Sequence, residues 1–375
     1  MLIYCKGVGC LMYETREVIK KTGISRQSLY NWISEGRISK PDKSSSKRLL
    51  WNENHIQEIN QIIELNQANM NKKSIDTLNI GNRRYLGSKQ KALDFIWNTV
   101  SQNTSGVNTV ADIFGGTGVV ADLFSKNNKK VIINDILYSN YVSYQTWFGN
   151  EEVDLNKIRN ILIGLNEIKG RNGYVTKNFG NKYFNFNNAM KIDAIREEIE
   201  NYDDKINGRE KSFMLTSLMY AMDKVANTVG HYDAHRRSID DEAILELRMP
   251  DVVTSGSNQI YNMDANQLVR KIEADLVYID TPYNSRGYEN MYHVLENILE
   301  WKKPQVEGVA MKAIDRSSKG SDYNKSKAPV AFDDLISNIK SKYILVSYNN
   351  TGENGNSRSN AKISHYEIVS TLLKR

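Results

Sequence analysis

Cysteine, proline and histidine are scarce in this sequence, and their scarcity excludes several classes of protein. The chain has 375 residues with two cysteines, five prolines and five histidines. Cys5 and Cys10 both lie near the N-terminus, where they make neither a disulfide framework nor a complete metal site. The histidines show no HExxH pattern, so we expect no metal centre. This cysteine usage is typical of a protein of the reducing cytoplasm.

Long apolar runs are missing as well. No run reaches membrane-spanning length and no secretory signal pattern is present, so we expect no membrane association. The charged fraction of 25% and the apolar fraction of 40% are those of a globular protein, long enough for one large domain or two. The net charge of +6 suits a polyanionic partner without requiring one.

Residues 14–38 predict two short helices around a turn. Gly23 ends the first helix and Ser25 caps the second, which carries Leu29, Trp32 and Ile33 on one face. The pattern resembles the helix-turn-helix of small DNA-binding regulators. The exposed start of its recognition helix, a candidate DNA contact, comprises Ser25, Arg26, Gln27, Ser28 and Tyr30. A purely structural helical hairpin is the alternative interpretation.

The rest of the N-terminal region divides into three segments, after an extension over 1–11 that we expect to be disordered. PDKSSSKR (41–48) predicts a loop, and 53–69 predicts an amphipathic helix with its isoleucines on one side. Residues 71–82 are polar without a period and predict a linker. We therefore assign 1–75 to an all-α helix-turn-helix module with its amphipathic helix.

After the linker, apolar strand-like runs alternate with helical segments. The runs are 107–114, 130–135, 274–280 and 342–348. Continuous apolar strands between helices favour a mostly parallel α/β sheet. Residues 150–258 are mainly helical and too numerous for a loop. The predicted fold is a Rossmann-like α/β sheet built from 83–149 and 259–375, with a helical insertion over 150–258.

Three motifs at predicted strand ends indicate a ligand-binding edge. ADIFGGTGVVADLF (111–124) predicts a strand, a glycine-rich turn and a helix from about Thr117, which lets backbone approach an anionic ligand. Asp135 ends the next strand, about 20 residues on, where dinucleotide folds bind ribose hydroxyls. Asp264 lies in NMDANQL (262–268). Each has a structural alternative, a tight turn for the first and a helix-capping acid for the other two.

The fourth motif is DTPY (280–283), which follows the apolar run 274–279. The order of glycine turn, acid, insertion and Asp-Thr-Pro-Tyr resembles the Dam-like α-group of S-adenosylmethionine-dependent adenine-N6 DNA methyltransferases. RRYLGSK (83–89) resembles the N-terminal motif of that family. DTPYNSRGYENMYHVLE (280–296) and VGHYDAHR (229–236) are similar to its type II restriction-modification subgroup. The resemblance covers residues 83–375.

The resemblance implies a site-specific adenine-N6 methyltransferase that uses S-adenosylmethionine, acts on double-stranded DNA and accompanies a restriction endonuclease. The N6 amine is a poor nucleophile, and the Asp280 carboxylate and the Thr281 carbonyl would hold its hydrogens. Tyr283 would stack on the flipped base while Pro282 fixes the turn. The family usually has proline where this chain has Thr281, so we expect some loss of rigidity and rate.

The same resemblance assigns cofactor and DNA contacts. The cofactor contacts are Tyr85 and Lys89 at the methionine end, Asp112, Phe114, Gly115, Gly116 and Gly118 in the loop, Asp135 at the ribose, and Asp264 and Ala265 at the adenine. The insertion corresponds to the target-recognition region, and the loop 302–330 is basic. Candidate phosphate contacts there are Lys177, Lys182, Arg236, Arg237 and Arg316, each of which is otherwise a solvated surface charge.

Two alternative functions stay open. The same acceptor arrangement serves the N4 amine of cytosine. The chain would otherwise be a helix-turn-helix regulator with an inactive methyltransferase domain, because the family usually continues into a final pair of strands and this chain stops at Arg375. We expect a short C-terminus to leave an edge strand exposed. The intact acids Asp112, Asp135 and Asp280 argue against decay of the site.

Overall fold

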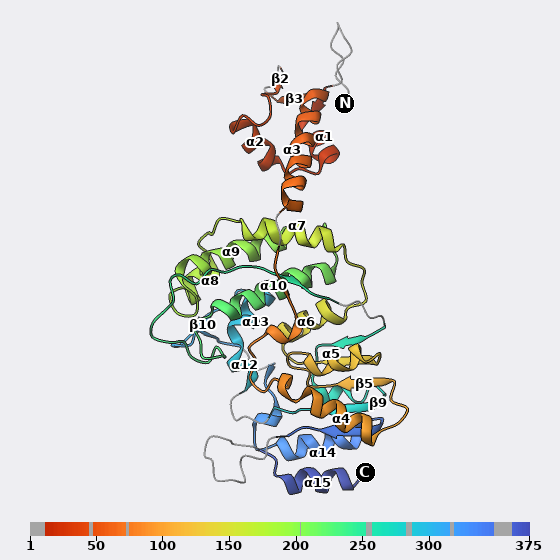
Figure 1. The fold of residues 1–375 in the computed structure, drawn as a ribbon. Helices are drawn as coiled ribbons and strands as arrows, with labels where there is room; N and C mark the ends of the chain where they lie inside the picture. The colour runs from red at the N-terminus through yellow and green to blue at the C-terminus, as the bar shows by residue number, and fades with distance from the viewer. Residues whose placement is uncertain are drawn as a thin grey trace. The chain divides into compact units, whose positions relative to one another are not determined.

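The chain divides into two compact units, residues 1–74 and 75–375. The computed structural model describes residues 12–44, 48–72 (backbone only from 66), 75–202, 204–252, 257–282, 287–315, 319–348 and 362–375. Figure 1 follows the chain through both units. The extension predicted for 1–11 lies outside the described residues.

The two helices predicted at the start of the chain are confirmed. Helix α1 spans Thr15–Thr22 and α2 spans Arg26–Ser34. Gly23 ends α1 with a left-handed φ of 71°, and its N–H donates to the Ile19 carbonyl at 2.9 Å. The Ser25 hydroxyl caps α2 by accepting from the Ser28 N–H at 3.1 Å. Gly23 therefore ends the first helix and Ser25 caps the second, as the sequence predicts.

The prediction that this unit is all-α, with a loop over 41–48, is wrong. β1 (Tyr13–Glu14), β2 (Asp42–Lys43) and β3 (Leu49–Trp51) form an antiparallel sheet in the order β1-β3-β2. Strands of two or three residues show no periodicity in a serine-rich segment, so the sequence does not predict them. The fully buried Trp51 fixes β3 in the core, and its indole N–H donates to the Thr15 hydroxyl at 3.0 Å.

A long helix completes the core of this unit. Helix α3 spans Glu53–Lys72, and Ile56, Ile59 and Ile62 are buried on one side of it, as their spacing predicts. They pack with Val18, Leu29 and Trp51 in a core of their own.

The linker predicted for 71–82 is wrong in its second half. Thr77–Leu78 forms β4, which pairs in parallel with β7 (Met249–Pro250), and Ile80–Asn82 forms a 3-10 turn. Leu78 and Ile80 are each only 4% exposed. Two isolated apolar residues are too few to show a helical or strand periodicity. Their burial depends on segments far along the chain.

The described part of the second unit has a five-stranded parallel sheet, which confirms the predicted fold class. Its strands are β5 (Thr109–Asp112), β6 (Lys130–Asn134), β8 (Gln259–Tyr261), β9 (Ala274–Ile279) and β12 (Ser341–Val346). They lie in the order β12-β9-β5-β6-β8. The four predicted apolar runs did not include β8, a strand of only three residues, although the Asp264 motif was expected to follow a strand end. From β5 the chain builds outward through β6 and β8 and then returns to β9, so the strand order reverses between β5 and β9.

Consecutive strand residues face two different cores. Val110, Ile133 and Leu276 belong to the larger hydrophobic cluster, whereas Ala111 and Val277 belong to the smaller one. This is the period of two of a pleated strand. The sheet is therefore buried on both faces, which explains why its strands read as continuous apolar runs.

Helices cover both faces of the sheet. The larger cluster contains α4 (Leu93–Asn103), α5 (Val119–Lys126), α6 (Tyr138–Phe148), α7 (Leu155–Asn166), α8 (Tyr174–Phe179), α9 (Phe186–Glu200), α10 (Gly208–Val225), α12 (Tyr288–Met291) and α13 (His293–Glu300). The smaller one contains α11 (Ala265–Leu268), α14 (Ala328–Asn338) and α15 (His365–Leu373). Most helices of the predicted insertion thus share one core with the sheet, and Figure 1 shows them stacked as α7, α9 and α10.

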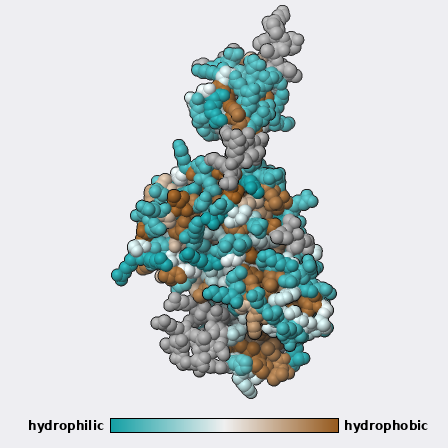
Figure 2. All heavy atoms as spheres, viewed as in Figure 1, coloured by the Kyte–Doolittle hydropathy of each residue, from teal (hydrophilic) through white to brown (hydrophobic). Residues whose placement is uncertain are grey.

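Two surface features complete the description. A short hairpin of β10 (Val306–Glu307) and β11 (Lys312–Ala313) follows α13. Apolar side chains gather over α14 and α15 in Figure 2. Val330 of α14 is 72% exposed and Leu373 of α15 is 81% exposed. None of the helices that the structure describes is both long and apolar enough to cross a membrane.

Replacing Ile59 by alanine tests the independence of the two cores. The side chain is fully buried in α3, and such a truncation costs about 2–5 kcal/mol. We expect amide hydrogen exchange to accelerate in peptides from the first unit and to stay unchanged in β5 and β9. Leu65→Ala, at a position 62% exposed on the same helix, is the control. Equal loss of protection in both units would contradict separate cores.

Candidate active site

The glycine loop between β5 and α5 requires glycine at particular positions. Gly116 and Gly118 have left-handed φ angles of 53° and 84°. A Cβ at Gly115 would lie 2.7 Å from the Tyr144 hydroxyl and 2.8 Å from Ile133. The Tyr144 hydroxyl in turn donates to the Gly116 carbonyl at 2.8 Å. The predicted helix begins at Val119, two residues after the expected Thr117.

Asp135 holds this loop from the neighbouring strand. Its Oδ2 accepts from the Gly116 N–H at 3.0 Å and its Oδ1 accepts from the Leu137 N–H at 2.9 Å. Burial raises the pKa of Asp135 to about 6, against the opposing effect of these hydrogen bonds and one from Asn140. One carboxylate therefore connects the end of β6 to the loop after β5.

The side chain of Asn134 joins the ends of three strands. Its amide nitrogen donates to the carbonyls of Ile113 and Met263, at 3.0 Å each, and its oxygen accepts from the Met263 N–H at 3.1 Å. Ile113 follows β5, and Met263 follows β8. Sequence reasoning missed Asn134, because an asparagine beside Asp135 gives no separate signal.

Asp280 and Lys89 form an ion pair at the end of β9. The ammonium of Lys89 donates to Asp280 Oδ2 and, at 2.9 Å, to the Gly87 carbonyl. Asp280 Oδ1 is buried and has no hydrogen-bond partner among the described residues. Burial raises the pKa of Asp280 to about 6, although Lys89 opposes the shift. At neutral pH Asp280 is therefore mostly an ionised acceptor with one oxygen unused.

Asp112 is the most deeply buried acid of the site. It is 1% exposed, and neither carboxylate oxygen has a well-aligned hydrogen-bond partner within the described residues. Burial, followed by the nearby charges of Asp280 and Asp135, raises the pKa of Asp112 to about 8. The carboxyl group is therefore mostly protonated at neutral pH.

Most of the predicted cofactor and catalytic residues line one pocket at the carboxyl edge of the sheet. Its volume is about 870 Å³, counting the space at its open mouth. The predicted residues along it are Tyr85, Lys89, Asp112, Phe114, Gly115, Gly116, Asp135, Asp264, Ala265, Asp280 and Pro282. Gly118 and Thr281 are not part of the lining, and Tyr283 lies outside the described residues. Thr281 is buried, 2% exposed.

Asp264 also has the structural role that its position allowed. Its Oδ1 caps α11 by accepting from the Gln267 N–H at 3.0 Å, and the side chain is exposed. The following Ala265 is buried in the smaller core while it lines the pocket. The interpretation of Asp264 as a helix cap is therefore correct, and the same residue also lines the pocket.

The predicted cofactor residue Tyr85 packs against two tyrosines that the sequence did not single out, Tyr288, which lines the pocket, and Tyr292, which does not. Tyr85 stacks on Tyr292 with ring centroids 4.5 Å apart, and on Tyr288 with centroids 5.6 Å apart. Beneath them the fully buried Arg83 pairs with Asp223, 3.4 Å away, and Asp223 also accepts from the Tyr232 hydroxyl at 2.8 Å. Tyr288 and Tyr292 come shortly after the DTPY motif, and this repetition of tyrosine was the sequence feature that could have indicated an aromatic cluster.

The predicted DNA-binding residues that the structure describes lie in both units. In the first unit Ser25, Arg26, Gln27 and Tyr30 are exposed and Ser28 is half-buried, with the Ser25 hydroxyl already engaged as a cap. In the second unit Lys182 and Arg236 lie side by side, because the Asn227 amide donates to both of their carbonyls at 3.0 Å. Lys177 and Arg237 are exposed, and Arg316 lies outside the described residues.

The segment 302–330, expected as one basic loop, is more structured than its composition predicts. Lys312 pairs with Asp233 at 2.6 Å, and Lys319 pairs with Glu296 and, at 2.7 Å, with Glu300. These partners come from other segments, so the sequence could not show that the charges are neutralised. Across the described ranges, no three His, Cys, Asp or Glu side chains are grouped to hold a metal ion.

A parallel sheet with a glycine loop, a strand-end acid and a pocket where its strand order reverses defines a Rossmann-like α/β fold, a class in which ligands bind at this edge of the sheet. The chain belongs to the D12 class N6 adenine-specific DNA methyltransferase family, whose profile matches residues 85–356. Residues 13–78 match the MerR HTH family of regulatory proteins. Both resemblances drawn from the sequence are confirmed at the level of family.

Curated relatives are named as modification methylases or type II methyltransferases. The chain is 36% identical over 289 residues to the modification methylase StsI of Streptococcus sanguinis, which covers 72% of this chain and 44% of that protein. It is 34% identical over 288 residues to the modification methylase LlaI of Lactococcus lactis subsp. lactis, covering 71% and 46%. It is 31% identical over 283 residues to the type II methyltransferase M.NlaIII of Neisseria lactamica, covering 72% and 84%. The chain thus spans less than half the length of the first two relatives and most of the third.

The raised pKa of Asp112 predicts a pH-dependent stability of the cofactor-free protein. Between pH 4 and 8 the folded state keeps a proton that the unfolded chain releases, so stability falls as pH rises and levels off above about 8. Asp112→Asn cannot lose a proton. We expect its Tm at pH 8.5 to exceed the wild-type Tm by roughly 3–10 °C, and the fall in Tm between pH 5 and 8 to be smaller.

Calorimetry across this pH range measures both effects. The exposed Asp204→Asn, in the turn after α9, is the matched control and should follow the wild-type curve. A curve for Asp112→Asn that runs parallel to the wild type at every pH would contradict the buried protonated acid.

Proposed function

We propose that this chain transfers a methyl group from S-adenosylmethionine to the N6 amine of adenine in double-stranded DNA, as the modification enzyme of a restriction–modification system. The observation that carries this proposal is the position of Asp280. Its carboxylate lines the same pocket as the glycine loop, with one oxygen paired to Lys89 and the other buried and unused. The family and the names of the relatives support the same chemistry.

The residues of the pocket fit S-adenosylmethionine. The glycine loop leaves backbone exposed where a Cβ would intrude, and Asp112 presents a buried carboxyl group without a well-aligned partner in the described chain. In our assignment Tyr85 and Lys89 hold the methionine end, and Asp112, Phe114, Gly115, Gly116 and Gly118 form the cofactor loop. Asp135 accepts from the ribose hydroxyls. Asp264 and Ala265 bind the adenine of the cofactor.

The bound cofactor supplies an electrophilic methyl group on a sulfonium sulfur. The protein has to make the N6 amine of the target a better nucleophile, because its lone pair is delocalised into the ring. Asp280 Oδ1 and the Thr281 carbonyl accept the two N–H groups and favour a tetrahedral nitrogen. On methyl transfer the sulfur–methyl bond would break to leave a neutral thioether, and the nitrogen would carry a surplus proton for which the Asp280 carboxylate is the base that the site offers.

Rigidity at the end of β9 makes these acceptors effective. The turn after Asp280 passes through the buried Thr281 and through Pro282, which fixes its backbone. Tyr283 follows and is assigned to stack on the flipped adenine. Lys89 lies against Asp280, so it keeps that carboxylate ionised beside a buried acid. Preorganised acceptors of this kind replace the metal or covalent nucleophile used by other transferases.

DNA contacts complete the proposal. Lys182 and Arg236, joined through Asn227, are assigned to phosphates of the target together with Lys177, Arg237 and Arg316. Cationic contacts of this kind supply affinity that falls with salt concentration. A cognate restriction endonuclease is the expected biological partner.

Replacing Asp280 by alanine tests the catalytic assignment. Loss of an acceptor used in the transition state should reduce kcat by about 10²–10⁴-fold, with S-adenosylmethionine affinity changed by less than about tenfold. Transfer of labelled methyl groups to unmethylated DNA and equilibrium cofactor binding measure the two effects. Glu273→Ala removes an exposed carboxylate from the opposite end of β9 and should be fully active. An Asp280→Ala protein with wild-type kcat would refute the assignment.

Digestion of the methylated DNA to nucleosides identifies the acceptor base. Label in N6-methyladenine supports the proposal, whereas label in N4-methylcytosine favours the alternative, since the same two acceptors would hold either amine. The nucleoside analysis needs no knowledge of the recognition sequence.

The first unit supports a second DNA-binding function. Its match to MerR-type regulators and the exposed start of α2 favour a module that contacts DNA through Arg26, Gln27, Tyr30 and the adjacent serines. Such a module either regulates transcription or adds affinity for the methylation target.

Arg26→Ala tests this second function in the full chain. We expect affinity for duplexes selected by the wild type from a random pool to fall by at least about fivefold, because an arginine contact to a base is worth about 1–3 kcal/mol. The kcat of methylation at saturating DNA should not change. Lys20→Ala, exposed in the last turn of α1, is the control. Wild-type affinity of Arg26→Ala for the selected duplexes would argue that the hairpin is structural.

A further inference from the structure

A short segment after the basic hairpin contributes a wall of the pocket. Lys319, Ser321, Tyr323 and Asn324 all line it, although this segment was not predicted to take part in cofactor binding. We call residues 319–324 the strap. The backbone turns into a 3-10 helix at Asp322–Asn324, and Tyr323 is 3% exposed.

Contacts at each end fix the strap. Lys319 is paired with Glu296 and Glu300, both on α13. Glu296 also accepts from the N–H groups of Tyr138 and Ser139, at 3.0 and 2.7 Å, at the start of α6. Tyr323 belongs to the smaller core with α11 and α14. The strap therefore connects the helical layer on one face of the sheet with the layer on the other.

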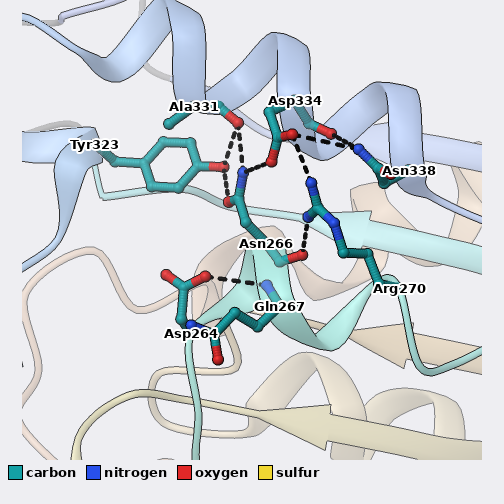
Figure 3. A network of polar contacts seen from close by, with 8 residues as sticks. All are labelled: Asp264, Asn266, Gln267, Arg270, Tyr323, Ala331, Asp334 and Asn338. Carbon is teal, nitrogen blue, oxygen red and sulfur yellow. Dashed lines mark hydrogen bonds and ion pairs between the residues drawn. The ribbon is translucent and has the colours of Figure 1, made fainter.

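The hydroxyl of Tyr323 is locked into a polar network, which Figure 3 shows from close by. It lies 2.7 Å from Asn266 Oδ1 and 3.2 Å from the Ala331 carbonyl. The Asn266 amide donates to the same carbonyl and to Asp334 Oδ2, at 2.8 Å each. Asp334 is held by Arg270 at 2.6 Å. Each partner limits the others, so Tyr323 has little freedom to turn.

This network lies directly behind the predicted adenine contacts. Asn266 follows Ala265 in α11, and Asp264 is the N-cap of this helix, so the hydroxyl of Tyr323 contacts the element to which both belong. The ring of Tyr323 meets Phe114 edge-on, with centroids 5.2 Å apart and planes at 82°. Edge-to-face packing of this kind orients the second ring as well as burying it.

The lining of the pocket contains both charged and apolar side chains. Asp112, Asp280 and Lys89 are among the charged ones, and Phe114, Met263, Ala265 and Tyr323 are among the apolar and aromatic ones. Apolar and aromatic surface suits a planar base, and charged groups suit a zwitterionic amino-acid group. We propose that Tyr323 is a positioning residue for the adenosine end of the cofactor, acting on Phe114 through its ring and on α11 through its hydroxyl. This inference rests on the proposed use of S-adenosylmethionine.

Tyr323→Phe removes the hydroxyl and keeps the ring. We expect the Kd for S-adenosylmethionine to rise about 3- to 10-fold, the effect of one buried hydrogen bond. The fragment 5′-methylthioadenosine should lose affinity by the same factor, because it keeps the adenosine end. Neither kcat at saturating cofactor nor KM for DNA should change, since the acceptors at β9 are untouched. Tyr366→Phe, at a position 80% exposed on α15, is the matched control.

Two further variants distinguish positioning from general stability. Lys89→Met, at the assigned methionine end, should weaken S-adenosylmethionine but leave 5′-methylthioadenosine unchanged. Asn266→Ala should weaken both ligands, and adding Tyr323→Phe to it should cost little more, because the hydroxyl acts through Asn266. Fully additive losses, or wild-type affinity of Tyr323→Phe for 5′-methylthioadenosine, would overturn the inference. If the wild-type chain itself binds neither ligand, the proposed function fails and the inference with it.

Discussion

The site depends on hydrogen bonds that the side chains of Asn134 and Asp135 make between the ends of neighbouring strands. Parallel strands finish at one edge with unpaired backbone groups, and buried groups of this kind are costly unless they are hydrogen-bonded. Asn134 satisfies the carbonyls of Ile113 and Met263, and Asp135 satisfies the N–H of Gly116. The glycine loop and the segment before α11 are thereby held on either side of the pocket.

Three buried or partly buried acids lie close together at this edge of the sheet. Asp112, Asp135 and Asp280 all have raised pKa values, since burial disfavours their ionised forms. Lys89 is the cation paired with Asp280 in the structure. The arrangement costs stability in the cofactor-free protein and leaves acceptors available at the end of β9. Functional sites commonly retain such costs, because the same unsatisfied groups are used when ligands bind.

The helices between 150 and 258 have a structural part as well as the recognition role assigned to them. Helix α10 packs on α6, and Arg83 reaches from the RRYLGSK motif to Asp223 in α10. The same acid holds Tyr232 of the VGHYDAHR segment. A substitution in this region can therefore alter the pocket through packing, without touching DNA. The core continues from the sheet into these helices.

The sequence by itself determined the parallel sheet, the glycine loop, the strand-end acids and the capped helices at the start of the chain. Each depends on local rules, namely apolar periodicity, glycine at left-handed φ, and acids or serines beside strand and helix ends. Only the tertiary structure decided the contacts between distant segments. It buried Leu78 and Ile80 from an apparent linker, paired Lys319 with Glu296, and brought Tyr323 against Phe114. In the sequence, a polar or aromatic loop residue looks the same whether its side chain is solvated or bound to another residue. Its partner lies far away in the chain, and only the folded backbone brings the two together.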